Sequence, residues 1–156
     1  MFLYLKAIIQ RVSSASVSVY NTQISSIKNG FLILLGVQQG DDEKDLEYLV
    51  NKTAGMRIFK DDKQHMNLSI KEVNGEALVV SQFTLCADTH KGRRPSFIHA
   101  APPEIAEQMY QQFCEQLKVA GVPVQTGKFG AMMDVSLIND GPVTIILDSR
   151  DKNWIV

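Results

Sequence analysis

The 156-residue sequence has few of the residues on which familiar catalytic and metal sites depend. Its two cysteines, Cys86 and Cys114, form no CxxC pair, so we expect neither a disulfide framework nor a zinc site. Its three histidines, His65, His90 and His99, have neither zinc-ligand nor nucleophile-elbow spacing. No glycine-rich loop of Walker or Rossmann type is present. We therefore expect no metal and no cofactor, and the cysteine content fits a reducing cytoplasm.

The sequence also lacks an excess of charge and a long apolar run. Its 16 Lys and Arg residues against 17 Asp and Glu residues give a net charge of −1. No global field draws such a chain to nucleic acid, so no DNA partner is predicted and an RNA contact requires a local patch. The apolar run at residues 1–5 is too short for a signal peptide or a membrane span. We predict a cytoplasmic protein with no membrane partner.

The apolar pattern predicts one domain over residues 1–156, because a chain of this length buries a sufficient core. Alternating or continuous apolar runs indicate strands at 5–10, 15–20, 23–27, 31–37, 77–83, 132–138 and 145–147. Two amphipathic helices are expected, one opening at residues 40–43 and one at 102–104. The inner stripe of the second helix is predicted as Ile105, Met109, Phe113 and Leu117. The fold class is therefore α+β, with a mostly antiparallel or mixed sheet or a partial barrel.

The stretch at residues 139–144, Asn-Asp-Gly-Pro-Val-Thr, combines unusual backbone limits with polar side chains. Gly141 can adopt angles closed to other residues, and Pro142 fixes its own φ and donates no hydrogen bond. A Gly-Pro pair between two strands is most simply a tight hairpin turn. Alternatively, it presents bare carbonyl oxygens in a rigid direction, and an X-Pro bond is where a cis peptide costs least.

A second polar stretch begins with Ser81 and Gln82, at the predicted end of a strand. Hydroxyl and amide groups in such a place orient neutral or oxyanionic oxygen atoms, or they satisfy the local backbone. Asp134 and Asp140 are candidate bases, although an aspartate in a turn more often caps its own backbone. No nucleophile with an adjacent base is evident from the sequence.

The densest positive patch is Lys91, Arg93 and Arg94, in the predicted loop at residues 90–95. Such a loop is usually only solubilising. The alternative is contact with a phosphate backbone, which depends on local rather than net charge.

Together these stretches resemble the D-aminoacyl-tRNA deacylase family, formerly called D-tyrosyl-tRNA deacylase. The similar segments are residues 8–12, 81–85, 91–97, 128–132 and 139–144, and they occur in the family's order along essentially the whole chain. The pairing of Ser-Gln-Phe-Thr-Leu with Asn-Asp-Gly-Pro-Val-Thr is highly specific. The chain departs from the pattern by a few extra N-terminal residues and by His65, where lysine is common.

The resemblance implies hydrolysis of the ester between a D-amino acid and the 3′-terminal adenosine of tRNA, with activity on glycyl-tRNA as well. It implies a metal-free homodimer with two composite sites. In the family the Gly-Pro bond is cis and enters the partner's pocket, so Gly141 and Pro142 are expected to do so here. Their carbonyls would hold the substrate's α-amino group and leave no space for an L side chain.

The resemblance also suggests roles for other residues. Ser81, Gln82, Phe83 and Thr84 would form the catalytic stretch on the adenosine and ester side. Arg11 would brace the Gly-Pro turn from across the dimer, and Met132 would form a wall of the pocket. Thr84 has been regarded as the nucleophile in this family. The competing view assigns the chemistry to the 2′-hydroxyl of the RNA, with backbone N–H groups as oxyanion donors, and the missing base near Thr84 favours that view.

Two other classes of function remain open from the sequence. A general Thr- or Ser-dependent esterase would act on small esters without tRNA. A non-catalytic RNA-binding module would bind without turnover, but the net charge of −1 and the lack of an RNA-binding aromatic signature argue against it.

Overall fold

The chain folds as a six-stranded sheet with two long helices. The computed structural model describes residues 4–153 and contains β1 (Lys6–Val19), β2 (Thr22–Ile27), β3 (Gly30–Gly36), α1 (Glu43–Gly55), β4 (Phe59–Lys60), β5 (Met66–Leu68), β6 (Glu76–Ser81), η1 (Phe83–Cys86), α2 (Pro103–Val119), β7 (Val124–Thr126), β8 (Asp134–Asp148) and η2 (Ser149–Asn153). The elements η1 and η2 are short 3-10 helices.

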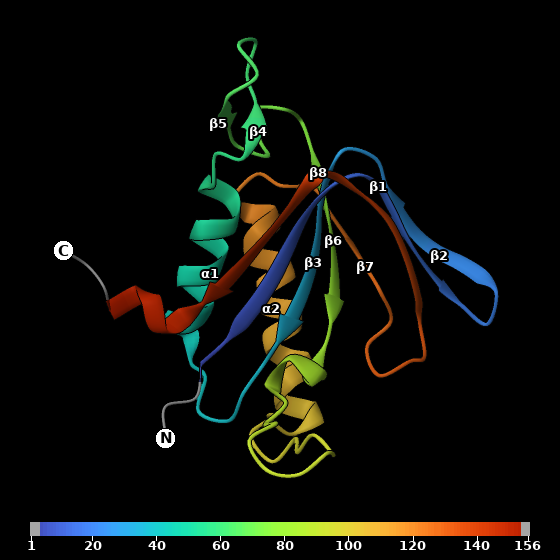
Figure 1. Ribbon diagram of the computed structural model, residues 1–156, viewed down its shortest axis with the longest axis vertical. Coiled ribbons are helices and arrows are strands. Elements are labelled where there is room, and N and C mark those ends of the chain that lie inside the picture. The colour runs from blue at the N-terminus through green and yellow to red at the C-terminus, as the bar shows by residue number, and fades with distance from the viewer. Residues whose placement is uncertain (1–3, 154–156) are drawn as a thin grey trace.

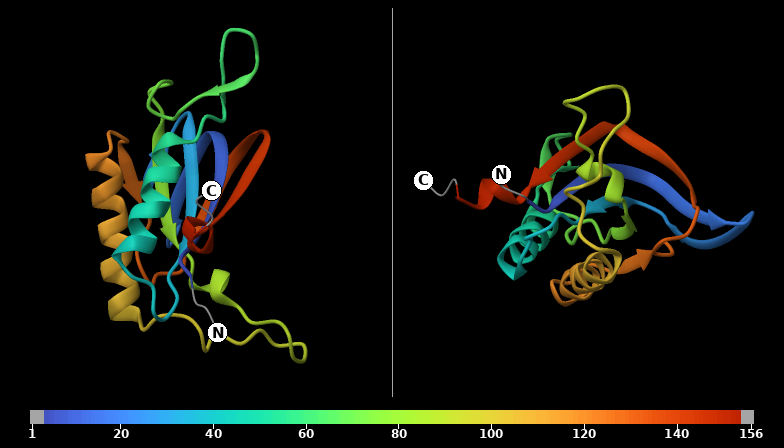
Figure 2. Two further views of the ribbon diagram at one scale, coloured as in Figure 1. Left: turned by 90° about the vertical axis from the view of Figure 1, so that its left-hand side faces the viewer. Right: turned by 90° about the horizontal axis from the view of Figure 1, so that it is seen from below.

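The sheet is mixed, as predicted. Its strands follow the order β2-β1-β3-β6-β7, and β8 pairs with β1 along the other edge of that strand. β1 runs antiparallel to β2, β3 and β8, whereas β3, β6 and β7 run parallel. The sheet curves towards a nearly closed barrel, and both long helices cover the same face of it (Figure 1, Figure 2). The α+β expectation is confirmed.

The central strand β3 is buried on both faces, because its apolar run lies between two clusters. Phe31, Ile33 and Leu35 point into the main core beneath the helices. Leu32 points into a smaller cluster on the other face, together with Val12 of β1. A continuous rather than alternating apolar run is what such a strand requires.

Local signals determine where α1 begins. The carboxylate of Asp42 accepts hydrogen bonds from the backbone N–H of Lys44 (2.9 Å) and of Asp45 (3.1 Å). The carboxylate of Asp45 accepts a bond from the backbone N–H of Asp42 (2.8 Å), which completes a capping box.

Within residues 4–153 no helix is long and apolar enough to cross a membrane.

Two local predictions were wrong. The strand predicted to reach Phe83 ends at Ser81, and Phe83 begins η1. Ile105 was assigned to the inner stripe of α2, yet it is 50% exposed. Each residue of a helix advances about 100°, so a strict four-residue spacing drifts by about 40° at each step. Ile105 has therefore rotated away from the face on which Phe113 is buried, and the stripe uses Ala106 and Tyr110 instead.

This difference between two apolar residues of α2 is measurable. Phe113 is fully buried, so Phe113→Ala removes its packing and leaves a cavity. We expect this change to lower the free energy of unfolding by about 3–5 kcal/mol in urea titrations. The matched change Ile105→Ala should shift it by roughly 0.5 kcal/mol or less. Equal losses in the two variants would contradict the assignment of the buried face.

Candidate active site

A cavity with a volume of about 490 Å³ lies beside the end of β6. It is bounded by the end of β6, by η1, by the first turn of α2 and by the segment that leads into β8. The lining residues are Val37, Val80, Ser81, Gln82, Phe83, Pro103, Ala106, Phe129, Gly130, Ala131, Met132, Met133 and Val135. Apolar walls with a few polar groups are typical of a small-molecule site.

The polar stretch of the cavity lies where β6 gives way to η1. Ser81 is the last residue of the strand and pairs with Leu35 of β3. The backbone N–H of Gln82 donates to the carbonyl of Leu35 (2.8 Å), and the chain then turns into η1. The Gln82 amide donates to the hydroxyl of Thr84. Thr84 itself is exposed and is not among the residues that line the cavity.

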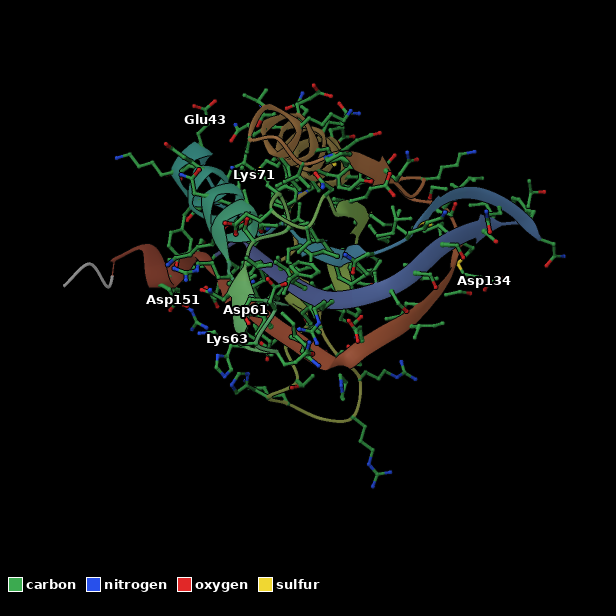
Figure 3. All side chains as sticks on the ribbon, turned by 90° about the horizontal axis from the view of Figure 1, so that it is seen from above. Glu43, Asp61, Lys63, Lys71, Asp134 and Asp151 are labelled. Atoms are coloured by element: carbon green, nitrogen blue, oxygen red, sulfur yellow. The ribbon has the colours of Figure 1, made fainter. Side chains whose placement is uncertain are left out.

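The Gly-Pro stretch does not form a hairpin, because a single strand, β8, runs through it. Val12 pairs with Asn139, and Gln10 pairs with Thr144. Arg11 alone therefore faces residues 140–143, which form an enlarged bulge in the strand, called the Gly-Pro bulge below. Residues 140–142 of this bulge are exposed, whereas Val143 is buried in the main core. Figure 3 shows β8 turning a corner between the end near Asp134 and the end that leads towards Asp151. The Gly141–Pro142 peptide bond is cis, as predicted.

The resemblance implies that Arg11 braces the turn from across the dimer, but here Arg11 contacts the inner side of the bulge of its own chain. Its side chain is 2% exposed, and its Nε donates to the carbonyl of Asp140 (3.1 Å). Its Nη1 donates to the carbonyl of Ile58 (2.6 Å), in the segment between α1 and β4. The Asp140 carboxylate lies 3.5 Å from Nε and supplies a counter-charge. A buried guanidinium needs such partners, so Arg11 links β1, β8 and the entry to β4.

The bulge is also fastened at its base. The Asn139 side-chain oxygen accepts a hydrogen bond from the backbone N–H of Val143 (2.8 Å), and its amide donates to the Thr144 hydroxyl (3.1 Å). Gly141 has φ +127°, and a Cβ added there would lie 2.7 Å from Nη2 of Arg11. The bulge therefore requires glycine at this position, for backbone conformation and for space.

The structure places seven of the sequence-predicted site residues in two groups, and Thr84, Lys91, Arg93 and Arg94 belong to neither. Ser81, Gln82, Phe83 and Met132 line the cavity, whereas the other group, Arg11, Gly141 and Pro142, lies at the bulge. The carbonyl of Ile58 has no sequence signal, because a backbone atom that accepts a bond from a distant arginine leaves no trace in the residue type.

The pairing of residues between neighbouring strands gives the distance between the two groups along the sheet. Arg11 pairs with Phe31, and Phe31 pairs with Ala77, so the bulge lies level with Ala77. Ser81 lies four residues further along β6, which is about 13 Å at ~3.3 Å per residue. Three strand spacings, about 14 Å along the sheet, also separate β8 from β6. Followed along the sheet, the bulge and Ser81 are therefore well separated within one chain.

The loop at residues 90–95, called the cationic loop below, follows η1 in the chain. Asp88 and Ser96 close its base through paired backbone hydrogen bonds of 2.7 and 2.9 Å. The Asp88 carboxylate accepts bonds from the backbone N–H of His90 (3.0 Å) and contacts its Nδ1 (2.7 Å), while Nε2 of His99 lies 3.6 Å away. The hydrogen bond from the His90 backbone N–H, and to a smaller extent the one from its side chain, lowers the pKa of the Asp88 carboxyl below its ordinary value. Lys91, Arg93 and Arg94 of this loop are all exposed.

The cysteines are not poised for nucleophilic chemistry. Burial raises the pKa of Cys86 to about 11 and that of Cys114 to about 12, so both are thiols near neutral pH. Among residues 4–153, no group of three or more His, Cys, Asp or Glu side chains is arranged to hold a metal ion.

Comparison with known proteins identifies the family. Residues 8–148 match the family model described as D-Tyr-tRNA(Tyr) deacylase. A D-aminoacyl-tRNA deacylase of Desulfatibacillum aliphaticivorans is 55% identical over 94% of this chain and 100% of its own length. One from Thermomicrobium roseum is 56% identical over 94% of this chain and 96% of its own.

Solved structures agree with this fold. A structure titled c-Myc DNA Unwinding Element Binding Protein superposes with a TM-score of 0.86 at 46% identity, covering 91% of this chain and 97% of that one. A probable eukaryotic D-amino acid tRNA deacylase gives a TM-score of 0.79 at 18% identity, over 94% and 100% of the two chains, which supports the fold alone. By its sequence over nearly its whole length, this chain belongs to the D-aminoacyl-tRNA deacylase family.

Proposed function

We propose that this protein hydrolyses the ester between a D-amino acid and the 3′-terminal adenosine of tRNA, and that it acts on glycyl-tRNA as well. Family membership supports the general reaction. The observation that carries the finer proposal is the Gly-Pro bulge, which Arg11 and Asn139 hold rigidly outside the strand. With aminoacylated tRNA as the substrate, the cytoplasm is the compartment that we propose.

The second part of the proposal is a symmetric homodimer with two composite sites. The reacting ester carbonyl and the α-amino group of an aminoacyl ester are separated by a single carbon atom. The bulge and the polar end of β6 lie about 13 Å apart along the strands of one chain. Both can contact one substrate only if the bulge of one copy enters the cavity of another, which two-fold symmetry provides twice.

Chirality is proposed to follow from exclusion. The carbonyls of Gly141 and Pro142 would accept hydrogen bonds from the α-amino group and thereby fix the orientation of the Cα atom. In that orientation an L side chain would collide with the bulge, whereas a D side chain would point away from it. Glycine has no side chain to collide, so such a site cannot reject glycyl-tRNA.

For the chemistry, water adds to the ester carbonyl carbon and the 3′-oxygen of the ribose leaves. The ester is already activated, so positioning and oxyanion stabilisation by backbone N–H groups at the start of η1 are proposed to suffice. The Thr84 hydroxyl accepts its hydrogen bond from the Gln82 amide, which is not a base. We therefore assign proton transfer to the neighbouring 2′-hydroxyl of the RNA, and a shaping role to Thr84.

The phosphates of the acceptor end are proposed to contact the cationic loop. Lys91, Arg93 and Arg94 are exposed on one loop whose base is closed by the Asp88–Ser96 bridge. Such a local cluster attracts a phosphate backbone even though the whole chain carries a net charge of −1.

A deacylation time course on matched D-tyrosyl-, L-tyrosyl- and glycyl-tRNA tests this function. The wild type should hydrolyse the D and glycyl substrates and spare the L substrate. Gly141→Ala should reduce kcat/KM on D-tyrosyl- and glycyl-tRNA by roughly 10²-fold, because a displaced bulge misplaces the substrate. The displacement follows from the 2.7 Å approach of the new methyl group to Arg11.

Gly40→Ala is the matched control for that experiment. Gly40 also has a positive φ, +86°, but a Cβ added there meets nothing within 4 Å. Its replacement should also strain the backbone but should keep the wild-type rates. Wild-type activity in Gly141→Ala, or equal hydrolysis of D- and L-tyrosyl-tRNA by the wild type, would contradict the proposal.

The role of Thr84 is tested by a pair of changes, one in the protein and one in the RNA. Thr84→Ala should retain kcat within about tenfold of the wild type, since removal of a true nucleophile costs several orders of magnitude. A D-tyrosyl-tRNA that ends in 2′-deoxyadenosine should react slowly with the wild type in single-turnover assays. An inactive Thr84→Ala, together with full activity on the deoxy substrate, would make Thr84 the nucleophile.

A further inference from the structure

A partly exposed aromatic pair lies between the cavity and the cationic loop. The rings of Phe83 and Phe97 meet edge to face, with centroids 5.1 Å apart and planes inclined at 70°. Phe83 lines the cavity and is still 56% exposed. Phe97 is half-buried, and the next residue, Ile98, is 69% exposed. Large apolar side chains gathered in this way on a surface indicate a contact site.

Backbone hydrogen bonds attach the segment around Phe97 to the rest of the protein, although the neighbouring loop extends away from the body of the protein (Figure 2). Phe97 directly follows Ser96, whose backbone pairs with Asp88 at the base of the loop. The Gln39 side chain donates to the carbonyl of Ile98 (2.9 Å), and the Gln39 backbone N–H donates to the carbonyl of His99 (2.9 Å). The segment after Phe97 is therefore tied to the connection between β3 and α1.

We propose that Phe83, Phe97 and Ile98 form a stacking platform for the base of the nucleotide that precedes the terminal adenosine. This inference rests on the proposed function, in which the terminal adenosine enters the cavity and the phosphates contact the cationic loop. The 3′ end of tRNA is single-stranded, so its penultimate base is free to stack. The platform lies where that nucleotide must pass, because Phe83 borders the cavity and Phe97 follows the loop.

The charges beside the platform favour an RNA strand over an apolar protein partner. Lys91, Arg93 and Arg94 precede Phe97 within six residues, and the nearby Asp88 carboxylate is engaged by His90. Aromatic side chains next to a positively charged track are the combination that binds unpaired nucleotides, since every base offers a π-face to a ring. The expected contact is independent of base identity.

The experiment uses uncharged tRNA that carries 2-aminopurine at the penultimate position, whose fluorescence is quenched by stacking. The wild type should quench it on binding. Phe97→Leu, which keeps apolar volume but removes the ring, should lose the quenching and weaken binding by roughly 5- to 100-fold. Phe97→Tyr, which keeps the ring, should restore both. Replacing Lys91, Arg93 and Arg94 with Ala should flatten the salt dependence of binding, whereas Phe97→Leu should leave its slope unchanged.

A second arm compares D-tyrosyl-tRNA with the D-tyrosyl ester of adenosine alone, which lacks the penultimate nucleotide. Phe97→Leu should raise KM for the tRNA about tenfold more than for the adenosine ester. Equal losses on both substrates would reduce Phe97 to a support of the cavity wall and overturn the platform. Unchanged quenching in Phe97→Leu, or dissociation of a dimer in that variant, would also overturn it.

The two arms separate this inference from the proposed function. If the wild type hydrolyses neither ester, the proposed function fails. The fluorescence arm needs only uncharged tRNA, so its outcome still decides whether the platform exists.

Discussion

The buried guanidinium of Arg11 is the interaction on which the site depends. A charge that is 98% removed from solvent is tolerable only with partners in place, and the carbonyls of Asp140 and Ile58 are those partners. One side chain thus fixes the position of the bulge in β8 relative to β1 and to the segment before β4. A Cβ at position 141 would lie 2.7 Å from Nη2 of the same guanidinium, so the position of Arg11 requires glycine there.

The exposed part of the bulge can act only on a molecule that binds against it. Within one chain the polar stretch at Ser81 lies several strands away from the bulge and further along the sheet. This separation gives a physical reason for a symmetric dimer that is independent of the family resemblance. In the dimer that we propose, chiral selection would belong to one copy and ester chemistry to the other.

The sequence predicts much of the fold and less of the site. The apolar run of β3 and the acidic start of α1 identified their elements correctly, because local pattern and tertiary environment agree there. The Gly-Pro stretch looks like a hairpin turn, since strand, turn and strand occur in the same order whether or not the chain reverses. Its pairing with β1 on both sides decides the matter, and that pairing is not local. Likewise, the apolar Phe83 extends a strand pattern although the chain has already turned into η1.

A mixing experiment tests the central claim that two copies share each site. Gly141→Ala displaces the bulge, and Ala131→Trp fills the cavity, so each variant alone should be roughly 10²-fold less active than the wild type on D-tyrosyl-tRNA. Random reassociation of equal amounts makes about half of the dimers mixed, and each mixed dimer has one intact site, so about a quarter of the wild-type activity should return. If differently tagged mixed dimers are isolated and remain inactive, the bulge and the cavity do not act across the two copies.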